Sequence, residues 1–586
     1  MSPAFWRSWM TVIPLLTLLA LCVMPIAFMA YESMTLWNGL QRVGWGTTEG
    51  YLRVLRPDVI IPVGELVFRA VLTATVDIAI AIPVADYLIR LKPALRSVIL
   101  LLLTVPFVVS PTSRAFGWFQ ILNQAGYINH LVHSISPTAS PMSWLLYNRG
   151  SVIITLVAAT LSFSVFPIIL ALPSGTSSLW RAASDMGTSY FTRLSRITIP
   201  LGLPGIAIGW LCVFWLAFGS SVEASVVDGP TELSIGRIVN GLLSAGEFAA
   251  ACALGTSITV AFGLSAAIGY ILIRRSRHFP SQLNQDSSTT TKDSRSAQPT
   301  SVSIAVDSKS VYLRQRSPRL NHVLRITRAV SGGLFICIIL AYVLAPVGAV
   351  VAMSLTEMSH AGGSTFTLQY YLAAFGNESI KEAWFASLSV AVPVGLSCGI
   401  LGFACGLTWL SNKWRFVVIF GMAILALLPP DVYVLGLLQL AKSLGSKEAS
   451  LAWVGIAQVA GALPFCTAIV FAVNSAIDPF LLNVGMELGA SRLRLLSGVL
   501  LRLTWQGVAS AFLTGMLLSL NDYTRVSYLS GSVQFLTLYV YGKMKSGTDP
   551  TVYAVGSINA IAVILLFSFA LLIVRLSGGS RRNRLL

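Results

Sequence analysis

The sequence predicts an all-α membrane protein made of two tandem halves with six spans each. Hydrophobic residues fill 55% of the 586 positions and charged residues only 11%, whereas a soluble domain carries about a quarter. Apolar runs of about 20 residues, each long enough to cross the hydrocarbon core as a helix, alternate with short polar turns. The polar stretch RAASDMGTSYFTRLSRITIP at 181–200 has a blurred copy, NVGMELGASRLRLLSGVLLR, at 483–502. These three observations indicate membrane-spanning helices in a repeated arrangement.

The apolar runs predict about twelve spans, with six in each half of the chain. In the first half we expect them near 11–31, 67–89, 96–116, 151–173, 204–226 and 248–273. In the second half we expect them near 329–354, 384–409, 416–440, 450–475, 505–527 and 551–575.

Basic residues in short loops predict the orientation of the chain. RLKPALR at 90–96 and SNKWR at 411–415 are short and basic, which is typical of cytoplasmic loops. Arg7 and the RRNR of 581–584 place both termini on the same side. We therefore expect cytoplasmic N- and C-termini, with 181–200 and 483–502 also in the cytoplasm.

Two homologous domains and a linker follow from the repeat. Gly187 and Gly489 stand 302 positions apart, and VVDGP at 226–230 aligns with YLSGS at 528–532 at the same offset. An even number of spans inserts both halves the same way up, which predicts a two-fold axis along the membrane normal. We assign 1–275 and 326–586 to the two domains. Residues 276–325 are rich in Ser, Thr, Gln and Arg, which predicts a disordered cytoplasmic linker, centred on 277–320.

Composition and motifs exclude several classes of function. The formal net charge of +17 comes from loops between spans, so it does not point to nucleic acid. The seven cysteines form no CxxC pair and the five histidines show no metal spacing, so we expect no metal, no cofactor and no catalytic site. The sequence has no phosphate-binding GxxxxGK[ST], so the chain is not an ATPase.

The stretch 181–200 is predicted to fold as a helix, a turn and a second helix. Gly187 ends the first helix because it accepts a positive φ. The second helix carries an apolar stripe and ends where Pro200 bends the chain into the next span. That stripe is Tyr190, Leu194, Ile197 and Leu201, and the copy has Gly489 followed by Leu493, Leu496 and Leu500. One reading is a pair of helices that lie on the lipid surface. The other reading, which the repeat favours, is two equivalent docking points for a two-fold partner.

These residues resemble the cytoplasmic signature of bacterial ABC importer permeases, which reads E-A-A, three residues, G, nine residues, I-x-L-P. The first stretch matches it at Ala182, Ala183, Gly187, Ile197 and Pro200, with Arg181 in place of the glutamate and Ile199 in place of the leucine. The copy retains Gly489, with Val499 and Leu501 as acceptable replacements, whereas Asn483, Val484 and Gly485 replace E-A-A and Arg502 replaces the proline.

The resemblance implies two six-helix type I importer domains with coupling loops at 174–203 and 477–504. It implies that Ala182, Ala183, Gly187, Ile197, Pro200, Gly485, Gly489 and Val499 couple the chain to a cytosolic ATPase homodimer. It also implies a separate extracytoplasmic solute-binding protein and a location in the bacterial inner membrane. The chain itself would then be a transport subunit and not an enzyme.

Further segments are similar to the spermidine/putrescine branch of these permeases. They include TVPFVVSPTSRAFGW at 104–118, LLPPDVYV at 427–434 and LSLNDYTRVSYLSG at 518–531. The resemblance suggests a polyamine as the transported solute. Ferric iron, thiamine and 2-aminoethylphosphonate remain alternatives, because fused permeases of similar layout serve them. An ion-driven secondary transporter is the alternative class.

Acidic residues within the predicted spans are candidates for the solute path, because charge is costly in a membrane and is often functional there. They are Asp77, Asp431 and Asp522. Asp86 is expected to pair with Arg90 one helical turn away. Structural ion pairs with Arg69 or Arg114 are the alternative explanation for Glu223 and the candidate acids.

Overall fold

The computed structural model describes most of the chain as helices arranged in two similar halves. The described residues are 12–38, 41–138, 140–173, 175–229, 232–276, 318–358, 364–410, 415–445, 450–475, 477, 480–491, 494–547, 550–562, 564–565 and 568. Arg7, residues 277–317 of the predicted linker, 411–414 of the second basic loop, Leu493 and the RRNR of 581–584 lie outside them.

The first half runs from a membrane-spanning arm to a long final helix. Its elements are η1 (Leu19–Val23), α2 (Met24–Glu32), β1 (Thr35–Asn38), β2 (Gln41–Trp45), α3 (Glu49–Val54), α4 (Pro57–Leu88), α5 (Pro93–Val108), α6 (Pro111–Leu122), α7 (Tyr127–Ile135), η2 (Ser143–Leu145), α8 (Arg149–Ala171), α9 (Thr176–Asp185), α10 (Tyr190–Arg193), η3 (Leu194–Thr198), α11 (Ile199–Phe218), α12 (Val222–Val227), α13 (Ile235–Ser244) and α14 (Phe248–Ser276).

The second half repeats this order. Its elements are α16 (Pro318–Leu355), β3 (Thr356–Met358), β4 (Ser364–Phe366), α17 (Gln369–Gly376), α18 (Glu378–Gly406), η6 (Leu407–Leu410), α19 (Arg415–Leu427), α20 (Pro430–Ser443), α21 (Leu451–Asn474), α22 (Phe480–Glu487), η7 (Leu495–Leu500), α24 (Leu501–Leu520), α25 (Thr524–Leu529) and α26 (Leu536–Ser546). The 302-residue offset relates α8 to α21, α11 to α24 and α12 to α25.

The polytopic all-α fold is confirmed. In the described residues, nine helices are long and apolar enough to cross a membrane. Two further predicted spans are bent helix pairs, and the helix Thr551–Ala562 begins the last one. Both halves also carry a two-stranded antiparallel hairpin, β1–β2 and β3–β4, directly after the first span.

The third and ninth spans are not the continuous helices that we expected. The helices Pro93–Phe107 and Pro111–Ile135 meet at 93°, and Val417–Leu427 meets Pro430–Ser443 at 103°. Ser110 and Pro429 each precede a proline and are extended, with ψ of 133° and 129°. The ring of the following proline disfavours a helical conformation for the residue before it, which favours a break at these two positions.

The fifth and eleventh spans also differ from the prediction. They start earlier, as the continuous helices Tyr190–Phe218 and Leu495–Leu520, and they end before 226 and 527. A π-helical segment, η3 or η7, replaces the bend expected at Pro200. Since η7 forms without a proline, the proline is not its cause. The chain then breaks again before the short helices α12 and α25.

The predicted linker is shorter than 276–325. Ser276 still belongs to α14, and the residues from Pro318 onward are the first turns of α16. RLNHVLRITR at 319–328 contains good helix formers, and the adjoining apolar span propagates the helix into it.

The two halves exchange their first spans. Helix α2 of the first half packs against α20 of the second, and α16 of the second half packs against α6 of the first. Glycines allow both contacts: a Cβ on Gly117 would lie 2.1 Å from the carbonyl oxygen of Pro346, and one on Gly436 would lie 2.5 Å from that of Pro25. One hydrophobic core therefore contains residues from both halves.

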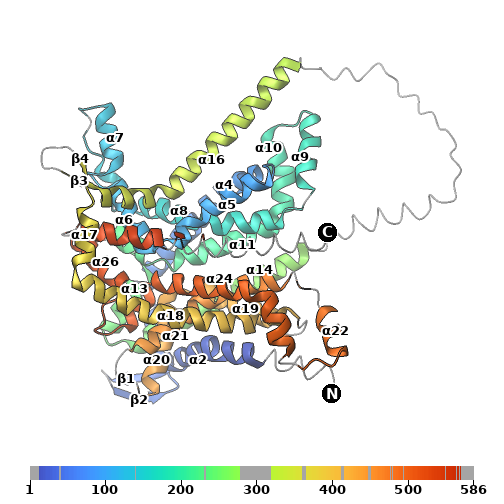
Figure 1. Cartoon of the computed structure of the whole chain (residues 1–586). Coiled ribbons are helices and arrows are strands. Elements are labelled where there is room, and N and C mark those ends of the chain that lie inside the picture. Colours follow the sequence, from blue (N-terminus) through green and yellow to red (C-terminus); the bar gives the residue numbers. More distant parts are fainter. Residues whose placement is uncertain are drawn as a thin grey trace.

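The elements are sorted between two ends of the helix bundle (Figure 1). The hairpins β1–β2 and β3–β4 and helices α7 and α17 lie at one end, on the left of the view, which we call the hairpin end. Helices α9, α10 and α22 lie at the opposite end, which we call the α9/α22 end. The repeated stretches of the sequence therefore come to the same end of the molecule.

Candidate functional site

The first repeated stretch folds as the predicted helix–turn–helix. Helix α9 ends in a Schellman motif, in which Gly187 N–H bonds to the Ser184 carbonyl at 3.0 Å and Thr188 N–H to the Ala183 carbonyl at 3.2 Å. Gly187 has a φ of 78°, and an added Cβ would meet nothing within 4 Å. The turn therefore needs glycine for its backbone conformation and not for space. The Ser189 hydroxyl then caps α10 by accepting from Thr192 N–H at 3.1 Å.

The second stretch repeats this turn. Gly489 N–H bonds to the Met486 carbonyl at 3.0 Å, and Ala490 N–H bonds to the Gly485 carbonyl at 3.1 Å. Gly489 has a φ of 75° and, like Gly187, open space around it. Gly485 has another reason to be glycine, because a Cβ there would lie 2.5 Å from Cδ2 of Leu495. The degenerate copy thus keeps the backbone geometry of the first stretch.

Trp180 anchors the first stretch to the core, a role that the sequence analysis missed. Its ring is 3% exposed and lies between the guanidinium groups of Arg90 and Arg193, at 4.3 and 4.6 Å. The indole N–H donates to the Thr198 hydroxyl at 2.8 Å, and that hydroxyl donates to Asp86 at 2.7 Å. Asp86 pairs with Arg90 at 2.5 Å, as expected from their spacing. This cluster connects α9 to the end of α4 and to the start of α11.

The other predicted coupling residues differ in their exposure. Ala182 and Pro200 are exposed at the α9/α22 end, whereas Ala183 is buried against its own chain, and Ile197 and Val499 are half-buried. Ala183 therefore packs inside the stretch and does not form part of its outer surface. Large apolar side chains stand exposed on these segments, namely Leu179, Met186, Phe191, Phe480 and Leu488.

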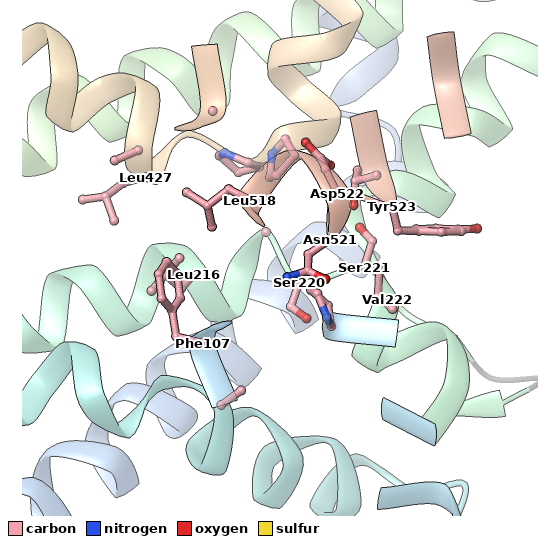
Figure 2. Close-up of a pocket in the computed structure, with 18 of the residues that line it drawn as sticks. Phe107, Leu216, Ser220, Ser221, Val222, Leu427, Leu518, Asn521, Asp522 and Tyr523 are labelled. Carbon is pink, nitrogen blue, oxygen red and sulfur yellow. The ribbon is translucent and has the colours of Figure 1, made fainter. Parts of the chain in front are cut away.

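A cavity of about 250 Å³ lies between the two halves, at the four breaks in the helices (Figure 2). The breaks α5–α6 and α11–α12 contribute from the first half, and α19–α20 and α24–α25 contribute from the second. Apolar side chains, among them Phe107, Leu216, Leu427 and Leu518, gather on one side of the view, and Ser220, Ser221, Asn521 and Asp522 lie on the other. The cavity therefore combines an apolar wall with a polar wall.

Two arginine–carboxylate pairs line the polar wall. Arg114 Nη2 lies 2.7 Å from Glu223 Oε1, and both side chains are about nine-tenths buried. Arg114 also donates to the Pro106 and Val109 carbonyls, which the break between α5 and α6 leaves without helical partners. In the second half Arg525 pairs with Asp522 at 2.9 Å, and its guanidinium lies directly against Gly461. The alternative expectation of a structural ion pair is correct for Glu223.

The three candidate acids stand at different distances from the cavity. Asp522 lines it. Asp431 is buried beside the lining residues Pro430 and Ser221 and accepts a hydrogen bond from the Ser221 hydroxyl at 2.8 Å. Asp77 is fully buried behind the wall, where it accepts from the hydroxyls of Thr160 (2.9 Å) and Ser164. Arg69 lies near Asp228 instead, at 3.9 Å.

Sequence reasoning missed several residues of the cavity. Arg525 stands at the position equivalent to Glu223, a substitution of opposite charge that the 302-residue offset could have revealed. The aromatic residues Phe107, Phe163, Trp215, Phe465 and Tyr523 give no signal within apolar spans, but they also line the cavity. In the part of the chain that the structure describes, no three His, Cys, Asp or Glu side chains gather in a way that could hold a metal ion.

Comparison with known proteins finds relatives in one transport system. The chain is 29% identical over 222 residues to the spermidine/putrescine transport system permease protein PotB of Salmonella typhimurium (strain SL1344), which is 37% of this chain and 76% of the relative. It is 28% identical over 219 residues to PotB of Escherichia coli (strain K12), which is 37% of this chain and 79% of the relative. PotC of Haemophilus influenzae (strain ATCC 51907) is 26% identical over 248 residues, which is 41% of this chain and 95% of the relative. No family model matches the chain.

The extent of these matches agrees with the repeat. Each one covers about two-fifths of this chain but three-quarters or more of the relative. One half of the chain thus corresponds in size to one separate permease subunit. The match to two different permeases, PotB and PotC, fits a chain in which two such subunits are fused, and it places the chain among multi-pass membrane proteins.

Proposed function

We propose that this chain, a fused two-half permease of the ABC importer family, forms by itself the membrane path for a polyamine in the inner membrane. The main support for this proposal is the pair of equivalent glycine turns at one end of the molecule. The two halves that carry these turns also enclose a cavity between them. ATP hydrolysis then belongs to a separate subunit.

The α9/α22 end supports docking of an ATPase homodimer. Two turns of the same geometry present exposed apolar side chains there, including Met186 (73% exposed), Phe191 (78%) and Leu488 (81%). Large apolar groups at such exposure indicate an interface. Closure of the ATPase dimer would move both helices and switch the halves as rigid bodies. Because Trp180 bonds to Thr198 and Thr198 bonds to Asp86, a displacement of α9 would displace α4 and α11 as well.

The hairpin end supports docking of the extracytoplasmic binding protein. A charged cavity of about 370 Å³ opens there and is lined by Arg53, Asp58, Glu232, Arg237 and Glu247. Arg53 lies between Asp58 at 2.8 Å and Glu247 at 2.7 Å, and these carboxylates raise the pKa of its guanidinium because both stabilise its charge. Fixed charges of both signs suit recognition of one partner in one orientation.

Chemistry of the central cavity supports a cationic solute. Glu223 and Asp522 supply carboxylates that the solute would share with Arg114 and Arg525. Phe107, Trp215 and Tyr523 supply ring faces that attract ammonium groups. The relatives are named for spermidine and putrescine, which are such cations.

One observation favours a second candidate solute. Arg114 and Arg525 also line the cavity, and a guanidinium recognises a phosphonate or phosphate oxygen pair. A zwitterion such as 2-aminoethylphosphonate would therefore find partners for both of its charges.

Transport by the reconstituted complex tests the proposal. The chain is assembled with its ATPase and binding protein in proteoliposomes, and ATP-dependent uptake of labelled putrescine, spermidine, 2-aminoethylphosphonate, thiamine and ferric iron is measured. We expect uptake of a polyamine, with loss on Gly187→Asp. Failure of any ATPase to co-purify, together with normal uptake by Gly187→Asp, would indicate an ion-driven transporter. Uptake of another solute alone would move the assignment to that solute.

A further inference from the structure

Asp431 occupies an unusual position at the junction between the halves. It follows the break between α19 and α20 and is only 2% exposed. Its Oδ2 accepts from the Ser221 hydroxyl at 2.8 Å, and its Oδ1 accepts from the Tyr528 hydroxyl at 3.0 Å. Ser221 precedes α12 in the first half, whereas Tyr528 belongs to α25 in the second. One carboxylate therefore connects α20 to an element of each half.

The packing around Asp431 is tight enough to require a glycine at position 236. A Cβ on Gly236 in α13 would lie 2.5 Å from Asp431 Oδ1 and 3.0 Å from the Ser221 hydroxyl. The Tyr528 hydroxyl also lies 3.5 Å from the Gly236 carbonyl. Helix α13 of the first half thus covers the carboxylate from the other side.

Neutral groups hold this charge. Within the described residues, Asp431 forms no ion pair at 4 Å or less, and its side-chain partners are the two hydroxyls. Arg525, on the same helix as Tyr528, is paired with Asp522 and acts on Asp431 only from beyond ion-pair distance. A buried carboxylate whose direct partners are neutral is costly, so it gains from any cation that reaches it.

The contacts of Asp431 lie between the cavity and the hairpin end. Ser221 and Pro430 line the cavity, with Ser221 visible on its polar side (Figure 2). Helices α13, α20 and α26 lie toward the hairpin end (Figure 1). A second hydroxyl contact between the halves, Tyr541 to Ser225 at 3.0 Å, lies in the neighbouring elements α26 and α12. The cavity is thus closed on this side by contacts between the halves.

We propose that Asp431 is a carboxylate latch: bound to Ser221 and Tyr528 it closes the cavity toward the hairpin end, and once released it binds an ammonium group of the solute. The cation replaces the two hydroxyl donors on the same carboxylate oxygens, so the buried charge is never left without a hydrogen-bonding partner. The ligand role rests on the proposed polyamine transport, whereas the closing role does not.

Cysteine labelling tests the closing role without any solute. Leu216→Cys places a thiol in the cavity, and an impermeant maleimide is added at the hairpin side of the assembled transporter in vesicles without nucleotide. Ser221→Ala and Tyr528→Phe each remove one hydrogen bond to a charged acceptor, so we expect labelling about threefold faster or more for each. The chain without Leu216→Cys corrects for the seven native cysteines.

Matched substitutions decide whether the carboxylate matters. Ser225→Ala and Tyr541→Phe remove the neighbouring hydroxyl contact between the halves, and we expect them to change labelling less than twofold, since no charged group is involved. If Ser221→Ala and Tyr528→Phe label no faster than these two controls, the latch is wrong.

Asp431→Asn tests the ligand role. An amide still bonds to both hydroxyls but without the charge, so labelling rises less than with Ser221→Ala or Tyr528→Phe, whereas putrescine uptake falls about tenfold or more. Parental uptake by Asp431→Asn would overturn the ligand role. If the parent itself takes up no polyamine, the proposed solute is wrong. The labelling experiment still tests the closing role in that case, because it uses no solute.

Discussion

Gly187 and Gly489 have nearly the same φ, but their surroundings differ. The helix before Gly187 is held by the buried ring of Trp180, which the guanidinium groups of Arg90 and Arg193 contact. The helix before Gly489 packs through Gly485 against Leu495. The first turn is therefore tied to α4 by charged and hydrogen-bonding groups, whereas the contact described for the second, Gly485 against Leu495, is apolar packing.

We expect Gly187→Ala to reduce transport more than Gly489→Ala. Both substitutions place a Cβ at a left-handed φ, at a cost of about 1 kcal/mol each. Only the first disturbs a helix that is linked to α4 through Asp86 and Arg90. Solute uptake per ATP hydrolysed in proteoliposomes measures the effect. Equal defects from the two substitutions would contradict the predicted asymmetry, in which 182–187 matters more than 483–489.

Trp180→Ala should uncouple ATP hydrolysis from uptake. It removes the ring between two guanidinium groups and leaves the Thr198 hydroxyl without its donor, a loss of about 2–4 kcal/mol. Trp180→Phe keeps a ring there and should lose less. Trp144→Ala, at a 68% exposed tryptophan within η2, is the control. If Trp180→Ala leaves the uptake per ATP hydrolysed unchanged, the Trp180 cluster does not transmit motion from α9 to the spans.

At the scale of the element, local sequence explains the breaks but not the π-helical segments. Pro111 and Pro430 favour an extended conformation in the residue before each of them. Arg114 then pairs with Glu223, which is far away in the sequence, and donates hydrogen bonds to the Pro106 and Val109 carbonyls that the break leaves without helical partners. The segments η3 and η7 occur at equivalent positions with different sequences, so their cause lies in packing.

Gly117→Ala and Gly436→Ala should each destabilise the exchanged arms. The added methyl meets a backbone carbonyl of Pro346 or Pro25, which cannot move aside as a flexible side chain could. Overpacking of this kind costs about 1–3 kcal/mol. Thermal unfolding in detergent measures the loss. Gly263→Ala in α14, with nothing within 4 Å of the new Cβ, is the matched control and should be neutral or slightly stabilising.

At the scale of the whole molecule, the exchanged arms make each half incomplete alone. Helix α16 covers α6, α2 covers α20, and Tyr433 donates to the Leu21 carbonyl at 2.9 Å across the junction. We therefore expect the folded halves to stay together without residues 277–317, which join α14 to α16 in the chain.

Cutting the chain within 277–317 should leave a functional complex. When residues before and after the cut are produced as two chains in one cell, we expect them to co-purify, because the arms bury apolar surface in the opposite half. An affinity tag on one fragment and detection of the other measures assembly. Fragments that purify separately, each stably folded, would show that the exchanged arms are not required.

The polytopic all-α fold, the two-fold repeat and the helix–glycine–helix geometry of 181–200 and 483–502 were predictable from the sequence, whereas the breaks in the third and ninth spans were not. The predictable features follow from apolar length, from chain spacing and from the backbone freedom of glycine, all of which are local properties. The three-dimensional packing was needed to show which half each arm covers and that Trp180 joins α9 to α4. It also showed that Asp522 lines the cavity, that Asp431 lies beside it and that Asp77 lies behind its wall. Those outcomes depend on which side chains meet across distant segments, and in a chain this apolar many alternative pairings of helices have the same local pattern.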